Sequence, residues 1–171
     1  MGKKIAALVT DMVEEIEFTD PAEKMREAGH TVSIVNAEAG KEIRGKNGQN
    51  FTVDKGLDEV SPEDFDALLI PGGFSPDLLR INPDHASFAK HFIAEGKPVF
   101  AICHGPQFLI DTDLLEGKRV TSFISVRKDL INAGAQFVDE EVVVDQQLVT
   151  SRTPDDLPAF NREALRLLLN N

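Results

Sequence analysis

The chain contains a single cysteine, Cys103, in the segment FAICHGP between an apolar run and a Gly-Pro pair. A side chain between a buried strand and the start of a helix sits on a sharp, often strained bend above the sheet. Free amides and aligned peptide dipoles at such a helix start favour a thiolate, so we expect the thiol pKa to be lowered toward neutrality. The alternative is a small residue that fills a tight corner. The context favours a reactive nucleophile.

Two neighbouring features fit a nucleophilic site. His104 follows the cysteine directly and is placed to accept or stabilise the thiol proton. The alternative is a surface histidine of which only the backbone amide matters. Gly72 and Gly73 follow another apolar run, and the N–H groups of Gly73 and His104 together are suited to an oxyanion hole. A tight turn that needs positive φ at the glycines is compatible with that role.

Two carboxylates are weaker candidates. Glu17 lies with Glu14 and Glu15 in the loop after the first apolar run, where a solvated charge is the favoured interpretation. If Glu17 pointed at the thiol instead, desolvation would keep it protonated and able to hydrogen-bond the sulfur. Asp77 reads as a loop carboxylate that starts a helical turn, and nothing in the sequence alone places it near His104.

The sequence lacks the residues that several other classes of enzyme require. The four histidines are His30, His85, His91 and His104, so none follows the cysteine turn as the His-x-Glu of a class I glutamine amidotransferase would require. There is no P-loop and no Gly-x-Gly-x-x-Gly, and His85 and His91 are too far apart to share one helix face as metal ligands. We therefore expect no nucleotide, other cofactor or metal, and a lone cysteine excludes a disulfide within the chain.

Strands and helices alternate along the chain. Apolar runs predict strands, Pro, Gly and Asn mark the ends of helices, and an Asn-Gly pair marks a hairpin. The predicted strands are 4–9, 31–35, 66–70, 98–102, 142–144 and 148–150, with short ones near 120 and 137; the hairpin, inserted on the edge of the sheet, is 42–53. The predicted helices are 20–29 capped by Asp20, a short turn at 61–64 with its cap at Ser61, 82–95 opened by Asn82 and Pro83, 106–116, and 156–169 capped by Asp155.

This alternation predicts one α/β domain over residues 1–171, with a mostly parallel, doubly wound sheet and helices on both faces. Ligands of such sheets bind beyond the carboxyl ends of the strands. The loops 11–17, 71–73 and 103–105 all leave those ends, so they are expected to converge on one small site.

Charge and hydropathy limit the partners. The 171 residues carry a formal net charge of −11, which disfavours nucleic acids and anionic membranes. No apolar run approaches the roughly 18 residues of a transmembrane span, and the N-terminal segment lacks a signal-peptide pattern. A cytoplasmic location is the expectation.

The ordered motifs together resemble the ThiJ/PfpI superfamily, and within it the PfpI-type intracellular cysteine peptidases and bacterial general stress proteins. The resemblance covers nearly the whole chain, and its most specific part is the cysteine segment. It rests on residues 14–18 (EEIEF), 67–73 (ALLIPGG), 96–107 (GKPVFAICHGPQ), 131–135 (INAGA), 142–145 (VVVD) and 149–157 (VTSRTPDDL).

The resemblance implies a flavodoxin-like three-layer sandwich and a role for five residues. Cys103 matches the nucleophile, His104 the adjacent histidine, Gly73 the oxyanion glycine and Glu17 the acid that contacts the sulfur. Asp77 matches a carboxylate that reaches the site from a neighbouring subunit, although it is an aspartate where the archetype has a glutamate one methylene longer. A homo-oligomer, dimeric or larger, is implied as well.

For function, the resemblance implies a stress-protective cysteine-dependent enzyme. Its substrates would be reactive aldehydes or peptides and damaged or glycated proteins, in glyoxalase, deglycase or peptidase chemistry. One alternative is a redox sensor or chaperone-like stress protein in which Cys103 is oxidised to sulfinate. Another is an interaction protein in which the thiol has no role.

Overall fold

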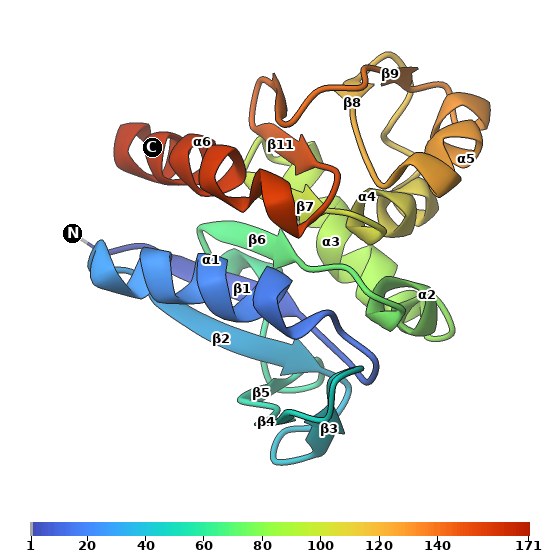
Figure 1. Ribbon diagram of the computed structural model, residues 1–171. Helices are drawn as coiled ribbons and strands as arrows, with labels where there is room; N and C mark the ends of the chain where they lie inside the picture. Colours follow the sequence, from blue (N-terminus) through green and yellow to red (C-terminus); the bar gives the residue numbers. More distant parts are fainter. Residues whose placement is uncertain (1) are drawn as a thin grey trace.

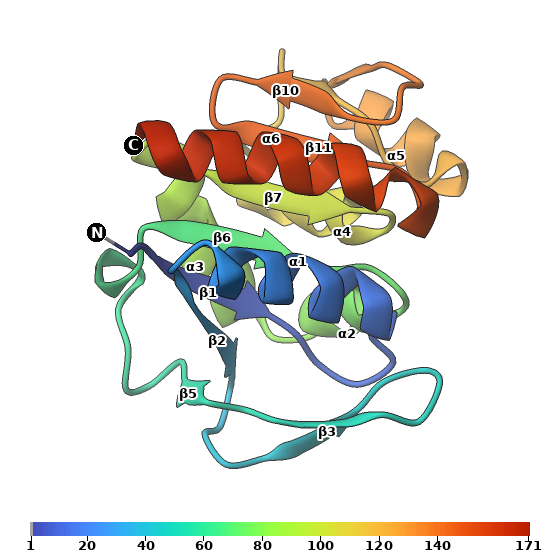
Figure 2. The same cartoon turned by 60° about the vertical axis from the view of Figure 1, so that its left-hand side comes forward.

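A seven-stranded sheet forms the centre of the computed structural model, which describes residues 2–171 (Figures 1 and 2). Met1, part of the expected domain, lies outside the described residues. The strand order is β10-β11-β7-β6-β1-β2-β5, and all neighbours are parallel except the pair β10 and β11. The strands are β1 (Lys4–Leu8), β2 (Thr31–Asn36), β5 (Lys55–Gly56), β6 (Ala67–Ile70), β7 (Val99–Ile102), β10 (Val143–Asp145) and β11 (Leu148–Ser151). The predicted doubly wound, flavodoxin-like sheet is confirmed.

Helices cover both faces of the sheet. In Figure 2, α1 (Glu15–Glu27) and α6 (Leu157–Asn170) lie side by side across one face. The other face carries α3 (Pro83–Ala94) with the shorter helices α2 (Ser75–Leu79), α4 (Gly105–Phe108) and α5 (Arg127–Asn132). Successive residues of β1 point to opposite faces, so Ile5 and Ala7 enter one core while Ala6 and Leu8 enter the other. The apolar runs of the sequence therefore form strands that are buried on both sides.

Two small sheets lie apart from the central one. The predicted hairpin is confirmed as β3 (Glu42–Arg44) and β4 (Asn50–Thr52), and β8 (Arg119–Val120) pairs with β9 (Gln136–Phe137). The hairpin was expected on the edge of the main sheet, but the edge strand is β5. Backbone hydrogen bonds from Met12 to Arg44 and from Lys46 to Val13 attach the hairpin to the loop after β1 instead.

The first helix begins five residues earlier than predicted. α1 starts at Glu15 and continues through Pro21, so Asp20 is not its cap. The Asp20 carboxylate instead accepts a hydrogen bond of 2.7 Å from Asn161 of α6. A proline in a helix interior loses one backbone hydrogen bond, but Pro21 is buried in this helix. Tertiary packing has therefore overridden the local start signal.

Two other helix boundaries differ from the prediction. α4 ends at Phe108 and tightens into a 3-10 turn (Leu109–Thr112), after which Asp113 has φ 61°. Thr112 closes this turn by donating to the Leu109 carbonyl at 2.6 Å. At α6, Asp156 and not Asp155 precedes the first residue, at the end of a 3-10 turn (Pro154–Asp156). The other 3-10 turns are Pro62–Asp64, where the predicted cap Ser61 is present, and Ile124–Val126.

Both ends of the described chain lie near the amino ends of the central strands, as Figure 1 shows. The loops expected to carry the site leave the opposite end. None of the helices in residues 2–171 is long and apolar enough to cross a membrane.

Candidate active site

Cys103 occupies the turn between β7 and α4 in a left-handed conformation with φ 64°. A non-glycine residue in this region is strained and stays there only when its surroundings hold it. The N–H of Cys103 donates to the Ser151 carbonyl at 2.9 Å, and its own carbonyl accepts from Phe123 at 2.8 Å. The side chain is only 9% exposed. The predicted strained turn is confirmed, and its backbone is fixed from both sides.

The predicted lowering of the thiol pKa is wrong for the free chain. Burial raises the pKa of Cys103 to about 12, and the charge of Glu17 adds to the increase. The backbone amides of Gly73 and His104 act in the opposite direction but do not overcome it. α4 spans only four residues, so few peptide dipoles are aligned with the sulfur. The cysteine therefore rests as a thiol and needs a base when it reacts.

Glu17 lies buried behind the sulfur, with no exposed surface. Its Oε1 accepts a hydrogen bond of 3.0 Å from the Gly72 N–H, while its Oε2 is buried without a partner. Burial raises the pKa of Glu17 to about 8, so the carboxyl is largely protonated at neutral pH. A protonated carboxyl can donate to the sulfur. The solvated interpretation is wrong, because α1 begins early enough to carry Glu17 inward.

Gly72 allows Glu17 and Cys103 to meet. A Cβ at this position would lie 2.5 Å from Glu17 Oε1 and 2.8 Å from Cys103 Cβ. Gly73 has φ 76° and pairs with Val13 in an isolated antiparallel bridge. The Gly73 and His104 amides both interact with the sulfur of Cys103, as their effect on its pKa shows. Two N–H donors therefore converge on the sulfur, and their role as an oxyanion hole stays a prediction.

His104 lies beside the thiol. Its Nδ1 is 3.4 Å from Cys103 Sγ, its Nε2 is 3.4 Å from Ser125 Oγ, and its ring stacks on Phe123 with centroids 5.1 Å apart. Burial lowers the pKa of His104, so the imidazole is neutral and free to accept a proton. Ser125 and Phe123 are contacts that the sequence did not indicate, because an Ile-Ser pair after a phenylalanine carries no recognisable signal.

Asp77 is near the site in its own chain but does not bond to His104. It lies in α2, and its negative charge partly opposes the fall in the His104 pKa. Within one chain, Ser125 Oγ contacts Nε2 of His104, the ring nitrogen that does not contact the sulfur. A role for Asp77 in a neighbouring subunit stays a prediction.

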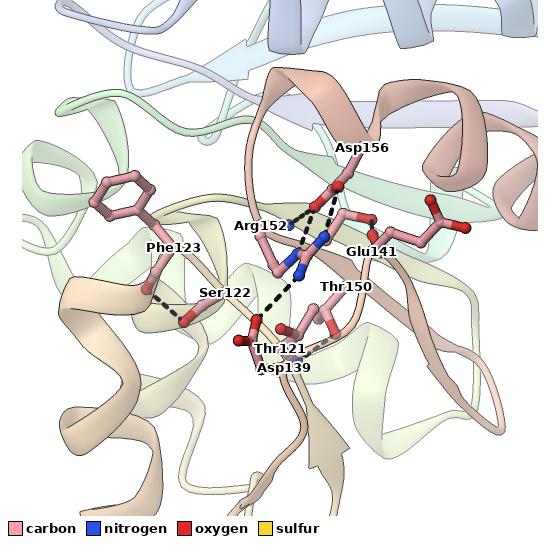
Figure 3. Close-up of polar contacts among 9 residues, drawn as sticks. Thr121, Ser122, Phe123, Asp139, Glu141, Thr150, Arg152 and Asp156 are labelled. Carbon is pink, nitrogen blue, oxygen red and sulfur yellow. Dashed lines mark hydrogen bonds and ion pairs between the residues drawn. The ribbon is translucent and has the colours of Figure 1, made fainter.

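An ion-pair cluster supports the end of β11 (Figure 3). The Arg152 guanidinium contacts Asp156 at 3.0 Å and Asp139 at 3.1 Å, and both carboxylates raise its pKa. The Ser151 hydroxyl donates to the Glu141 carbonyl at 2.7 Å. Since the Ser151 carbonyl accepts from the N–H of Cys103, this cluster anchors the strand that keeps Cys103 in its strained conformation.

The fold is a doubly wound α/β sandwich. Cys103 lies on a strained strand-to-helix turn, with His104 beside it and the buried Glu17 behind it. These features together define a class of α/β proteins that carry a cysteine at the strand-to-helix turn. Residues 3–167 match the model of the DJ-1/PfpI family, and the chain belongs to that family.

Three curated proteins are similar over nearly their whole length. The chain is 61% identical to Putative cysteine protease YraA of Bacillus subtilis (strain 168), covering 98% of this chain and 99% of that protein. It is 58% identical to Protein/nucleic acid deglycase 2 of Escherichia coli (strain K12) and 56% identical to General stress protein 18 of Bacillus subtilis (strain 168), each with the same coverage.

Solved structures agree with the fold. A two-domain protein of Anabaena variabilis with DJ-1/ThiJ/PfpI-like and ferritin-like domains superposes with a TM-score of 0.93 at 42% identity, over 96% of this chain and 47% of that one. DJ-1beta of Drosophila melanogaster superposes with a TM-score of 0.89 at 27% identity, over 98% of this chain and 91% of that one.

Proposed function

We propose that this protein is a stress-protective enzyme in which Cys103 attacks the electrophilic carbonyl of reactive aldehydes or of glycated and damaged proteins. The observation that carries the proposal is the contact of 3.4 Å between Cys103 Sγ and a neutral His104 on a strained turn. A buried thiol with a raised pKa is a poor standing nucleophile, but an adjacent base can remove its proton during attack. The names of the similar deglycase, protease and stress protein support this class.

In the first step the sulfur forms a bond to the aldehyde carbon while the thiol proton moves to His104 Nδ1. The carbonyl electron pair moves to the oxygen, which the Gly73 and His104 amides stabilise before it takes a proton. The product is a thiohemiacetal. With methylglyoxal, the C1 proton moves to the neighbouring carbon and the C1 hydroxyl proton moves to the oxygen on that carbon, with Glu17 or His104 as acid and base. The result is a lactoyl thioester. Water then releases lactate and restores the thiol.

The deciding experiment follows lactate directly during incubation of methylglyoxal with the wild-type protein and with Cys103→Ala. We expect lactate from the wild type and none from the variant. Equal lactate from both proteins would contradict the proposal. If neither protein consumes methylglyoxal, the same two proteins are assayed with glycated and unmodified peptides, and failure on every substrate overturns an enzymatic role.

A second candidate function is redox sensing. Glu17 Oε2 is buried and accepts no hydrogen bond from another group in residues 2–171, while the Glu17 carboxyl interacts with the Cys103 sulfur, so the carboxyl is suited to bond an oxygen of a sulfinate. Intact-mass measurement under graded peroxide tests this role. A stable two-oxygen adduct at modest peroxide, in a protein without turnover, favours sensing over catalysis.

We further propose that the protein is a cytoplasmic homo-oligomer, and that Asp77 of a neighbouring subunit approaches His104. Exposed apolar side chains support an interface beside the site: Met12 is 45% exposed and Phe74 52%. Their backbones are joined, because the Phe74 N–H donates to the Met12 carbonyl at 2.9 Å. A second copy that covers this patch would bring its own α2 close to the site.

A further inference from the structure

The turn of the β3–β4 hairpin is attached to the loop that precedes α1. The Met12 N–H donates to the Arg44 carbonyl at 2.8 Å, and the Lys46 N–H donates to the Val13 carbonyl at 3.0 Å. The buried Glu15 carboxylate accepts from the Asn47 and Gln49 N–H groups at 2.9 and 3.2 Å. The backbone on each side of Lys46 is therefore held in place.

That loop is in turn bonded to the glycine loop of the site. The Glu14 N–H donates to the Gly72 carbonyl at 3.1 Å, next to the Val13–Gly73 bridge. The hairpin, the loop after β1 and the Gly72–Gly73 turn thus form one connected layer over Cys103. A shift of the hairpin would be transmitted to the amides around the sulfur.

The hairpin places a cation on this layer. Lys46 Nζ forms an ion pair with Glu14 Oε2, and the Lys46 side chain is 44% exposed while that of Glu14 is 16% exposed. Lys46 also interacts electrostatically with Glu17 and Cys103. The two members of the pair act on Glu17 in opposite senses, since Glu14 raises its pKa and Lys46 lowers it.

We propose that Lys46 is a positioning residue of the active site, which balances the charge of Glu14 and thereby sets the reactivity of the Cys103 sulfur. The ionisable groups that act on the Cys103–Glu17 pair are Glu14 from the loop, Lys46 from the hairpin and His104 from the turn. Asp77 of α2 acts on His104. The inference rests on the reactive cysteine of the proposed function but does not require that any particular substrate be turned over.

Removal of the charge at Lys46 and removal of the charge at Glu14 are expected to change the reactivity of Cys103 in opposite directions. Removing the Lys46 charge leaves the Glu14 carboxylate uncompensated, which disfavours a developing thiolate on Cys103. Removing the Glu14 charge leaves the Lys46 cation without its carboxylate partner, which favours the thiolate of Cys103. A hairpin with only a structural role would make both variants less reactive or leave both unchanged, so the sign of the effect identifies the mechanism.

The test measures the alkylation rate of the only cysteine with iodoacetamide, from about pH 6 to about pH 10. Lys46→Met is compared with Lys41→Met, which removes an exposed lysine at the base of the same hairpin. Glu14→Gln is compared with Glu42→Gln, which changes an exposed side chain of β3. We expect Lys46→Met to lower the rate near neutral pH about two- to fivefold, as partly exposed charge pairs allow, and to move the profile to higher pH. Glu14→Gln moves it to lower pH, and Lys46→Arg retains the wild-type profile.

Equal profiles for Lys46→Met and Lys41→Met would overturn the proposal, as would shifts in the same direction for Lys46→Met and Glu14→Gln. Because alkylation needs no substrate, this failure is distinct from an absence of lactate formation. Circular dichroism of each variant establishes that the comparison is made between folded proteins.

Discussion

At the scale of residues, Glu17 and Cys103 form a buried pair with little charge at neutral pH. The pKa of both groups is raised, chiefly by burial, and a neutral imidazole lies against the thiol. Under the proposed function, such a site carries little charge at rest, and charge develops only when the carbonyl group is attacked.

The raised pKa of Glu17 predicts that Glu17→Gln stabilises the fold. An unfolded chain ionises Glu17 near 4.5, whereas the folded protein keeps its proton to about 8, so stability is lost as pH rises across this window. We expect the variant to melt a few degrees above wild type at pH 8 and close to it at pH 4.5, since each kcal/mol moves the Tm of a domain this size by about 2–4 °C. Melting curves across the window measure the difference. A difference independent of pH would show that Glu17 is not held protonated.

Gly72→Ala tests the close approach of Glu17 to the sulfur. The added Cβ would lie 2.5 Å from Glu17 Oε1, so the carboxyl must move, at a cost of about 1–3 kcal/mol of stability and with loss of turnover. Gly117→Ala is the control for loss of a glycine without a steric clash, because a Cβ at Gly117 would meet no atom within 4 Å. Gly117 has φ 78°, whereas Gly72 is not among the glycines with positive φ. Denaturant unfolding and the lactate assay are compared for the two variants. Equal losses of turnover in the two variants would show that turnover does not depend on the close approach of Glu17 to the sulfur.

At the scale of elements, the β3–β4 hairpin depends on Glu15. Burial by itself would raise the pKa of Glu15, but hydrogen bonds from its own N–H, Gln49 and Asn47 lower it below 4.5. Its contribution to stability is therefore present above pH 4.5 and is lost as pH falls through the lower folded value. The neighbouring glutamates Glu15 and Glu17 thus have opposite effects on stability.

Glu15→Gln is accordingly expected to destabilise the protein by about 1–3 kcal/mol at pH 7, the range for hydrogen bonds to a charged group. The reason is that a neutral amide accepts the hairpin N–H groups less strongly than a carboxylate does. Urea unfolding at pH 7 and near pH 4 measures the loss, which should shrink at the lower pH. A stabilising effect like that of Glu17→Gln would contradict this account.

The elements were predictable where local signals and burial agree. The apolar runs that became β1, β6, β7 and β11 alternate between two cores, and Asn82 caps α3 as expected, accepting from Asp84 at 3.0 Å. Prediction failed where distant contacts decide: Asp20 bonds to Asn161 of α6 and does not cap α1. The thiol pKa was missed for the same reason, because burial is a property of the assembled layers and not of the FAICHGP segment.

At the scale of the whole molecule, the proposed interface and the site share one surface. Met12 and Phe74 are exposed on the loops that carry Glu14 and Gly73, so a second copy docked there would lie against the loops that surround Cys103. Exposed apolar groups gathered in this way are typical of association surfaces. The oligomeric state and the activity should therefore change together.

Phe74→Glu tests this coupling. A charge in the patch should shift the protein toward monomers in light scattering and reduce lactate formation at equal protein concentration. Leu169→Glu is the control, since Leu169 is 82% exposed near the end of α6, at the opposite end of the sheet. Monomers with full activity would show that a neighbouring subunit contributes nothing to the site.

The bond between the Cys103 N–H and the Ser151 carbonyl joins two central strands between the cores. Hydrogen exchange at this amide should consequently require global unfolding, whereas the amides of the outlying hairpin exchange by local opening. Amide exchange is then expected to be slow on the β7 side of the site and fast on the hairpin side. A bound ligand would slow exchange of the cysteine amide by the amount that it stabilises the whole fold, and it would slow the hairpin amides only where it also prevents local opening.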